Sequence, residues 1–164
     1  MRHPDDPAAP PVRCAQDRYG DSDPQIAYFR IYFALMRINR TLMPPIEAVL
    51  RAQGIADPVW YEILLAAEEA GENGVQMLEL QRRLFLPQYA VSRHIARMQK
   101  AGLVHRKAAS GKGRGQTVFV TVAARGLHEQ VWNGYSRQVH AALAPKLDTQ
   151  DAYALLDMLN RLYP

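Results

Sequence analysis

The pattern of apolar and polar positions changes period several times along the chain and predicts a mainly helical protein. From Ile26 to Ile38 the sequence is apolar except at two arginines, and on a helix its apolar residues form two adjacent stripes. Such a helix is either buried in a large core or shared with another subunit, and a chain of 164 residues favours the second. We expect Pro44 and Pro45 to break or kink it, with a shorter helix from Ile46 to Gln53.

The central pattern predicts two short helices joined by a tight turn. Leu80 and Leu84 mark the inner face of the first helix, and Phe85-Leu86 forms the turn. The second helix runs from Pro87 to Lys100, and one buried stripe follows its spacing: Val91, Ile95 and Met98. This arrangement is a helix-turn-helix.

A β-hairpin is predicted after the second helix. Its first strand begins at Leu103-Val104, and three glycines punctuate its tip. Along the return strand, valines alternate with other residues in the period of a half-buried strand: Val118, Val120 and Val122.

Capping residues predict the starts of further helices. Asp57-Pro58 provides an N-cap carboxylate and a proline at the first helical position. A long helix is expected from Ala124 to about Leu143, where Pro145 stops it. Asp148-Thr149 then caps a last, strongly apolar helix.

Composition limits the protein class. An apolar content of 48% suffices for a core, whereas residues 1–23 are rich in Pro and Asp and predict a disordered tail. The single cysteine, Cys14, excludes an intramolecular disulfide. Without an apolar run of about 18 residues or a signal-peptide pattern, a cytoplasmic protein without membrane contact is expected.

Positive charge is concentrated in the predicted helix-turn-helix and hairpin. Residues 75–125 carry ten Lys and Arg against one Glu, a net charge of +9. Residues 1–74 carry −4 and residues 126–164 carry −1, within a chain of formal charge +4. Such a division of charge is expected when one face of a protein meets a polyanion, and double-stranded DNA is the predicted partner.

The order of these elements resembles that of the MarR (multiple antibiotic resistance regulator) family of winged-helix transcription factors. The resemblance covers residues 24–164. Its most specific part is a set of motifs in the central region: Leu80-x-x-x-Leu84, Pro87, Val91-Ser92-Arg93-His94, Met98 and Ala101-Gly102-Leu103-Val104. The fold class that it implies is mainly α with a small β wing, a winged helix-turn-helix domain plus a helical dimerisation domain.

Two departures from the family pattern concern the wing. Val122-Ala123-Ala124-Arg125-Gly126 is similar to the Leu-Thr-x-x-Gly that closes the family's wing, but Ala123 replaces the Thr. The hydroxyl of Thr121 is a candidate substitute for the missing helix cap. The family's Asp-x-Arg at the wing tip has no Asp here, and Arg114 is the preferred candidate for its arginine.

The resemblance implies a homodimer that holds two winged helices over a pseudo-palindromic operator. Its implied organisation is a tail at 1–23, dimerisation helices at 24–56 and 124–164, and a DNA-binding lobe at 57–123. It further implies a small-molecule effector, here of aromatic or phenolic type, that relieves repression. The function so predicted is a sequence-specific transcriptional repressor. The alternative is a winged helix that serves as a protein-interaction or ligand-binding module without operator recognition.

Candidate site residues fall into three groups. The outer face of the second helix is predicted to contact the major groove, against the alternative of an ordinary solvated face: Gln88, Tyr89, Ser92, Arg93 and Arg97. The hairpin is predicted to contact phosphates and the minor groove: Arg106, Lys107, Lys112 and Arg114. Aromatic residues could line an effector pocket, although core packing is the commoner role of such residues: Tyr28, Tyr32, Met36, Trp60 and Tyr61.

Other chemistry is not predicted. The five histidines lack the spacing of metal ligands, so structural or solvent roles are expected for them, and no cofactor is implied. No nucleophile motif or phosphate-binding glycine loop is present, and the chain is not expected to be an enzyme.

Overall fold

The computed structural model describes residues 19–108 and 115–163. It divides into two compact units, Met1–Met43 and Pro44–Pro164, and each unit is described by itself. Cys14, Lys112, Arg114 and most of the predicted tail lie outside the described residues. Among the helices that are described, none is both long and apolar enough to cross a membrane.

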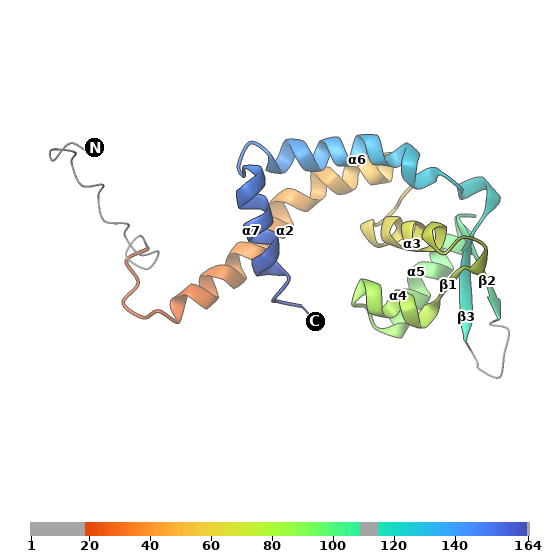
Figure 1. Cartoon of the computed structure of the whole chain (residues 1–164), viewed down its shortest axis with the longest axis horizontal. Helices are drawn as coiled ribbons and strands as arrows, with labels where there is room; N and C mark the ends of the chain where they lie inside the picture. Colours follow the sequence, from red (N-terminus) through yellow and green to blue (C-terminus); the bar gives the residue numbers. More distant parts are fainter. Residues whose placement is uncertain (1–18, 109–114, 164) are drawn as a thin grey trace, which may run out of the picture. The chain divides into compact units, whose positions relative to one another are not determined.

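The first unit contains the N-terminal part of helix α2, which spans Ile26–Ala52 (Figure 1). Large apolar side chains are exposed along this part: Tyr28, Phe29, Ile31, Tyr32, Phe33, Leu35, Met36 and Ile38. Just before the helix, the Asp21 carboxylate accepts two hydrogen bonds from Arg30, and the Arg30 guanidinium lies 5.1 Å from the centre of the Tyr19 ring. The described end of the predicted tail therefore contacts α2.

A break or a kink was expected at Pro44 and Pro45, and the break, with its separate helix from Ile46 to Gln53, is wrong, since α2 continues through both prolines. Proline lacks an N–H, so the carbonyls of Arg40 and Thr41 lose their helical donors. Both residues are exposed, and water can satisfy their carbonyls. Beyond the prolines, Ile46 and Leu50 are buried and hold the last turns of α2 in the second unit.

Helices α3, α4 and α5 form the centre of the second unit, at Pro58–Glu69, Met77–Leu84 and Gln88–Lys100. The predicted start of α3 is confirmed, because the Asp57 carboxylate accepts a hydrogen bond from the Val59 N–H at 2.9 Å and Pro58 occupies the first position. Phe85 ends α4 in the left-handed conformation with φ of 50°, which confirms the tight turn.

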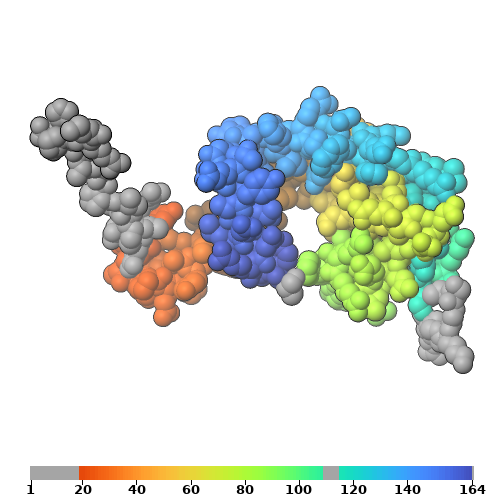
Figure 2. Space-filling view, viewed as in Figure 1, coloured from red at the N-terminus to blue at the C-terminus, as the bar shows by residue number. Residues whose placement is uncertain are grey.

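A three-stranded antiparallel sheet completes this lobe in the order β1-β3-β2. The strands are Val75–Gln76, Val104–Ala108 and Gln116–Val120, so the predicted hairpin is confirmed and the short β1 was not foreseen. Val122 was expected in the return strand, but it lies in the 3-10 turn η2 (Val122–Ala124) and is 79% exposed. In the space-filling view, the three helices and the sheet form one continuous body (Figure 2).

One apolar core joins the helices of this lobe to the sheet. Several of its side chains have no solvent exposure: Leu50, Ile55, Ile63, Leu64, Leu80, Val91, Ile95, Met98 and Val118. The predicted stripe of α5 is therefore confirmed as its buried face. Burial of each such side chain contributes about 1.5–3 kcal/mol, and it fixes the rotation of α5 about its own axis.

Helices α6 (Leu127–Leu143) and α7 (Thr149–Leu159) end the chain. Glu68 at the end of α3 accepts a hydrogen bond from the Gly126 N–H at 3.2 Å and pairs with the His128 ring, which ties α6 to the lobe. The predicted cap of α7 is confirmed, because Asp148 accepts from the Asp151 N–H at 2.8 Å.

Thr121 does not replace the missing helix cap, so that expectation is wrong. It occupies the N-cap position of η2, but its side chain makes no capping hydrogen bond there. The hydroxyl instead donates to the carbonyl of Gly102.

Candidate nucleic-acid interface

The helix-turn-helix presents one face of α5 to solvent because the opposite face is fixed in the core. Val91, Ile95 and Met98 have no exposure, and the buried Ala90 and His94 extend the same face toward α3. With about 3.6 residues per turn, Tyr89 and Arg93 lie opposite this buried face. Arg97 lies at its edge, on the side of Ala90 and His94.

The predicted recognition residues differ in their surroundings. Tyr89 is 74% exposed, Gln88 and Arg93 are also exposed, and Ser92 is half-buried. Among the described residues, no hydrogen bond or ion pair engages the side chains of Tyr89 and Arg93. Their donors and acceptors are therefore open to a ligand that approaches this face.

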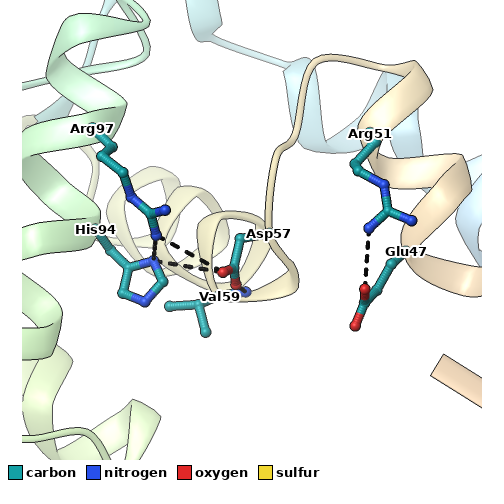
Figure 3. Close-up of polar contacts among 6 residues, drawn as sticks. All are labelled: Glu47, Arg51, Asp57, Val59, His94 and Arg97. Carbon is teal, nitrogen blue, oxygen red and sulfur yellow. Dashed lines mark hydrogen bonds and ion pairs between the residues drawn. The ribbon is translucent and has the colours of Figure 1, made fainter. Parts of the chain in front are cut away.

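Arg97 contacts three side chains, of which Figure 3 shows His94 on α5 and Asp57 at the start of α3. Its Nη2 lies 3.0 Å from Nδ1 of His94 and 3.9 Å from Oδ2 of Asp57, and its guanidinium carbon lies 5.9 Å from the centre of the Trp60 ring. A guanidinium only donates hydrogen bonds, so Nδ1 of His94 accepts and the ring is neutral in this arrangement.

The charge state of His94 follows from its burial. Burial lowers the pKa of His94 below the usual histidine value, the Asp57 carboxylate raises it, and the Arg97 and Arg93 guanidinium groups lower it further. The neutral ring that accepts from Arg97 is thus the form favoured at neutral pH.

The wing carries two described cations on β2. Arg106 donates to the side-chain carbonyl of Gln116 on β3 at 3.3 Å, and Nζ of Lys107 lies 5.0 Å from the centre of the Phe119 ring. The Lys107 ammonium therefore lies over the face of an aromatic ring, a cation–π contact, while the residue stays exposed. The other two predicted wing residues, Lys112 and Arg114, lie outside the described residues.

The net charge of residues 75–125 overstates the free positive charge, because Arg83 is paired. Its guanidinium contacts Glu79 at 2.8 Å and Glu69 at 2.9 Å. Both acids raise the pKa of Arg83. The side chain of Arg83 is therefore occupied on the surface of the lobe, whereas Arg93 is not.

The five candidate effector residues are divided between the two units. Trp60 and Tyr61 are 5% and 7% exposed in the core of the second unit, and the Tyr61 ring lies 5.1 Å from that of Tyr135. Burial also raises the pKa of Tyr61. Tyr28, Tyr32 and Met36 are exposed on α2 in the first unit, so the effector pocket remains a prediction.

Two residues of this interface were not assigned to it from sequence. Asp57 was identified only as a helix cap, and His94 was part of the family motif but was given only a structural or solvent role. The i, i+3 spacing of His94 and Arg97 was a signal that the two side chains meet. The contact of both with Asp57 depends on how α3 packs against α5, which no local pattern records.

The fold and the open face of α5 define a winged helix-turn-helix, a class whose second helix enters the major groove of duplex DNA. Residues 53–115 match the sequence model of the MarR family. Among curated proteins, no sequence matches this chain significantly.

Solved structures with the same fold include transcriptional regulators, two of which are described as MarR proteins. AbsC, a MarR family transcriptional regulator from Streptomyces coelicolor, has a TM-score of 0.72 at 22% identity, over 87% of this chain and 93% of its own. A mutant MarR from E. coli complexed with operator DNA has a TM-score of 0.73 at 20% identity, over 87% of this chain and 100% of its own. A probable transcriptional regulator from Pseudomonas aeruginosa has a TM-score of 0.68 at 25% identity, over 81% of this chain and 96% of its own. The sequence of residues 53–115 is thus similar to that of the MarR family, and the likeness to these solved structures is one of fold.

Proposed function

We propose that this chain is a homodimeric, sequence-specific regulator of transcription that binds a pseudo-palindromic operator in duplex DNA. The observation that carries the proposal is the outer face of α5, where the exposed side chains of Tyr89 and Arg93 have no partner among the described residues. An unpaired Arg at the centre of a helix face is suited to bidentate recognition of guanine in the major groove. Members of the family are transcriptional regulators and not enzymes.

Each candidate residue has a role in this proposal. Arg93 reads a base edge, whereas Gln88, Tyr89 and Ser92 contact bases or phosphates beside it. Arg97 lies at the edge of the face and contacts a phosphate. Arg106 and Lys107 contact phosphates from the wing, and insertion of Arg114 into the minor groove remains a prediction from sequence.

Exposed apolar surface supports the homodimer. On α7 and the residues after it, large apolar side chains are exposed: Tyr153, Leu155, Leu156, Met158, Leu162 and Tyr163. The first unit exposes a comparable set along α2, described above. Exposed apolar surfaces of this extent on both terminal regions are typical of subunit interfaces. A dimer with twofold symmetry would match the symmetry of an inverted-repeat operator.

The proposal includes a small-molecule effector. Its argument is the resemblance to the family together with the aromatic residues named above. A small phenolic ligand that weakens operator binding is the expected effector. Thermal shift measurements with a panel of phenolic acids would detect binding of such an effector. If no member of the panel changed the Tm, the effector would be ruled out, while the proposal of DNA binding would stand.

Selection of genomic DNA fragments with the purified protein at physiological salt tests the main proposal. Enrichment of one inverted-repeat sequence is expected, with half-sites separated by about one helical turn. Because nonspecific binding depends on salt and phosphate contacts, the selection is repeated with Arg93→Ala as a matched control. Equal recovery of unrelated fragments by both proteins would favour the protein-interaction or ligand-binding alternative.

A further inference from the structure

The contacts of Arg97 suggest how its side chain is held before DNA arrives. Arg is long and flexible, so an unrestrained guanidinium on a helix surface samples many rotamers. Here His94, Asp57 and Trp60 contact one guanidinium from the side of the protein, while the Arg97 side chain remains 51% exposed on the other side. A guanidinium has five N–H donors, so the contact with His94 leaves others free.

We propose that Asp57 and His94 are positioning residues for DNA binding, because they hold the Arg97 guanidinium at the edge of the α5 face, where it contacts a DNA phosphate. The inference rests on the proposed function. It adds two residues that do not touch DNA. Arg97 is the contact, and Asp57 and His94 act through it.

The geometry separates the two roles of Asp57. One carboxylate oxygen, Oδ1, accepts from the Val59 N–H and caps α3, whereas Oδ2 faces His94 and Arg97 at 3.9 Å from each. Asn is as good a helix cap as Asp, because its side-chain oxygen accepts the same hydrogen bond. Asp57→Asn therefore keeps the start of α3 and removes only the charge that faces Arg97.

The sign of the effect distinguishes positioning from general electrostatics. Removal of a negative charge from a DNA-binding lobe tightens binding when only the overall potential matters. Positioning predicts that Asp57→Asn weakens binding by about threefold to tenfold, equally on operator and random duplex, since a phosphate contact carries no sequence information. In an Arg97→Ala background the same substitution is expected to have no further weakening effect.

Glu47 supplies the matched control. It pairs with Arg51 on α2 at 3.1 Å, and Figure 3 shows this pair apart from the Asp57 cluster. Glu47→Gln removes the same charge without changing a contact of Arg97. It is expected to leave DNA affinity unchanged or slightly raised.

His94 gives an independent test through pH. Protonation turns Nδ1 of His94 into a donor, which can no longer accept a hydrogen bond from Arg97. The charged groups that act on the ring are Asp57 at the cap of α3 and Arg93 and Arg97 on α5. Because burial lowers the pKa of His94, DNA affinity of the wild type is expected to fall only at pH values below the usual histidine range, as His94 protonates. General electrostatics predicts the opposite sign, because a bound proton adds positive charge to a DNA-binding lobe.

Two substitutions of His94 complete the experiment, with fluorescence anisotropy on labelled operator and random duplexes as the readout. His94→Asn places an oxygen acceptor near the position of Nδ1 and does not titrate, so it is expected to rescue binding at neutral pH and to abolish the acid-dependent loss. His94→Leu fills the space without an acceptor and is expected to weaken binding as Asp57→Asn does.

Failure of this inference is distinct from failure of the proposed function. Wild type that prefers no duplex sequence would overturn the proposed function. Wild type that binds its operator while Asp57→Asn binds equally or more tightly would overturn the inference alone. The same conclusion would follow if Asp57→Asn weakened binding equally with and without Arg97, or if His94→Asn kept the acid-dependent loss.

Discussion

The hydroxyl of Thr121 donates a hydrogen bond of 2.7 Å to the carbonyl of Gly102. This bond joins the residue after β3 to the turn that follows α5, and the Thr121 N–H donates beside it to the Leu103 carbonyl at 3.0 Å. The base of the wing is thus anchored to the C-terminal end of the predicted recognition helix.

Loss of this hydroxyl is expected to destabilise the lobe. Thr121→Val keeps the shape of the side chain and leaves the Gly102 carbonyl without its donor, at a cost of about 1 kcal/mol. The expected decrease in Tm is about 2–4 °C for a chain of this size. Thr121→Ser retains the hydroxyl and serves as the control in thermal denaturation. Equal Tm values for Thr121→Val and wild type would show that the bond contributes nothing.

Gly74 is required for two reasons that can be separated. Its φ is +62°, and a Cβ at this position would lie 2.6 Å from Cε1 of Phe119. Gly74→Ala therefore combines backbone strain with a steric clash, and we expect a loss of about 2–4 kcal/mol in the free energy of unfolding.

Gly54 is the matched control for Gly74. Its φ is +82°, but a Cβ there meets no atom within 4 Å. Gly54→Ala should show the strain alone, about 1–2 kcal/mol. Urea denaturation measures both variants, and Phe119→Leu in the Gly74→Ala background should recover part of the difference. Equal losses at the two glycines would contradict the clash.

Arg93 is expected to determine sequence preference. Arg93→Ala should weaken operator binding by about 1–3 kcal/mol and relax specificity at one base position, because its partners at the centre of the α5 face are base edges. Lys100→Ala, at the exposed C-terminal end of the same helix, is the comparison and should weaken all duplexes alike. Titration of single-base operator variants tests this assignment. A loss for Arg93→Ala that is uniform across all of them would make it a phosphate contact.

The proposed subunit interface can be tested on α7. Leu156 is 45% exposed in the single chain, and a charge at this position would be buried without a partner in the dimer. Leu156→Glu is therefore expected to shift the protein from dimer to monomer in analytical ultracentrifugation. Gln150→Glu adds the same charge at an exposed position of the same helix and should leave the dimer intact. A dimeric Leu156→Glu protein would place the interface elsewhere.

Local chemistry was sufficient to predict much of this fold. The caps at Asp57 and Asp148 and the stripe of Val91, Ile95 and Met98 are local features, and the structure confirms each. The prediction of a break at the prolines of α2 failed because the cost of a proline in a helix is a local effect, whereas burial of the following turn depends on tertiary packing. Strand β1 was not predicted because two residues are too few to show an alternating pattern.

The candidate interface was less accessible to sequence. Exposure of Tyr89 and Arg93 follows from helical periodicity and was predicted by it. The cluster around Arg97 could not be predicted from periodicity, since tertiary packing joins residues in it that are forty positions apart in the sequence. Charge counting also treated Arg83 and Arg93 alike, although only Arg83 has acidic partners in the structure.

The position of Arg97 over Trp60 gives the lobe an intrinsic optical reporter. The chain has two tryptophans: Trp60 is 5% exposed with an indole N–H that has no partner among the described residues, and Trp132 on α6 is 53% exposed. Trp132→Phe leaves one fluorophore, whose emission is sensitive to a cation above its ring. Engagement of DNA by Arg97 would then register as a change in the fluorescence of a residue buried beneath it, without any label on the protein.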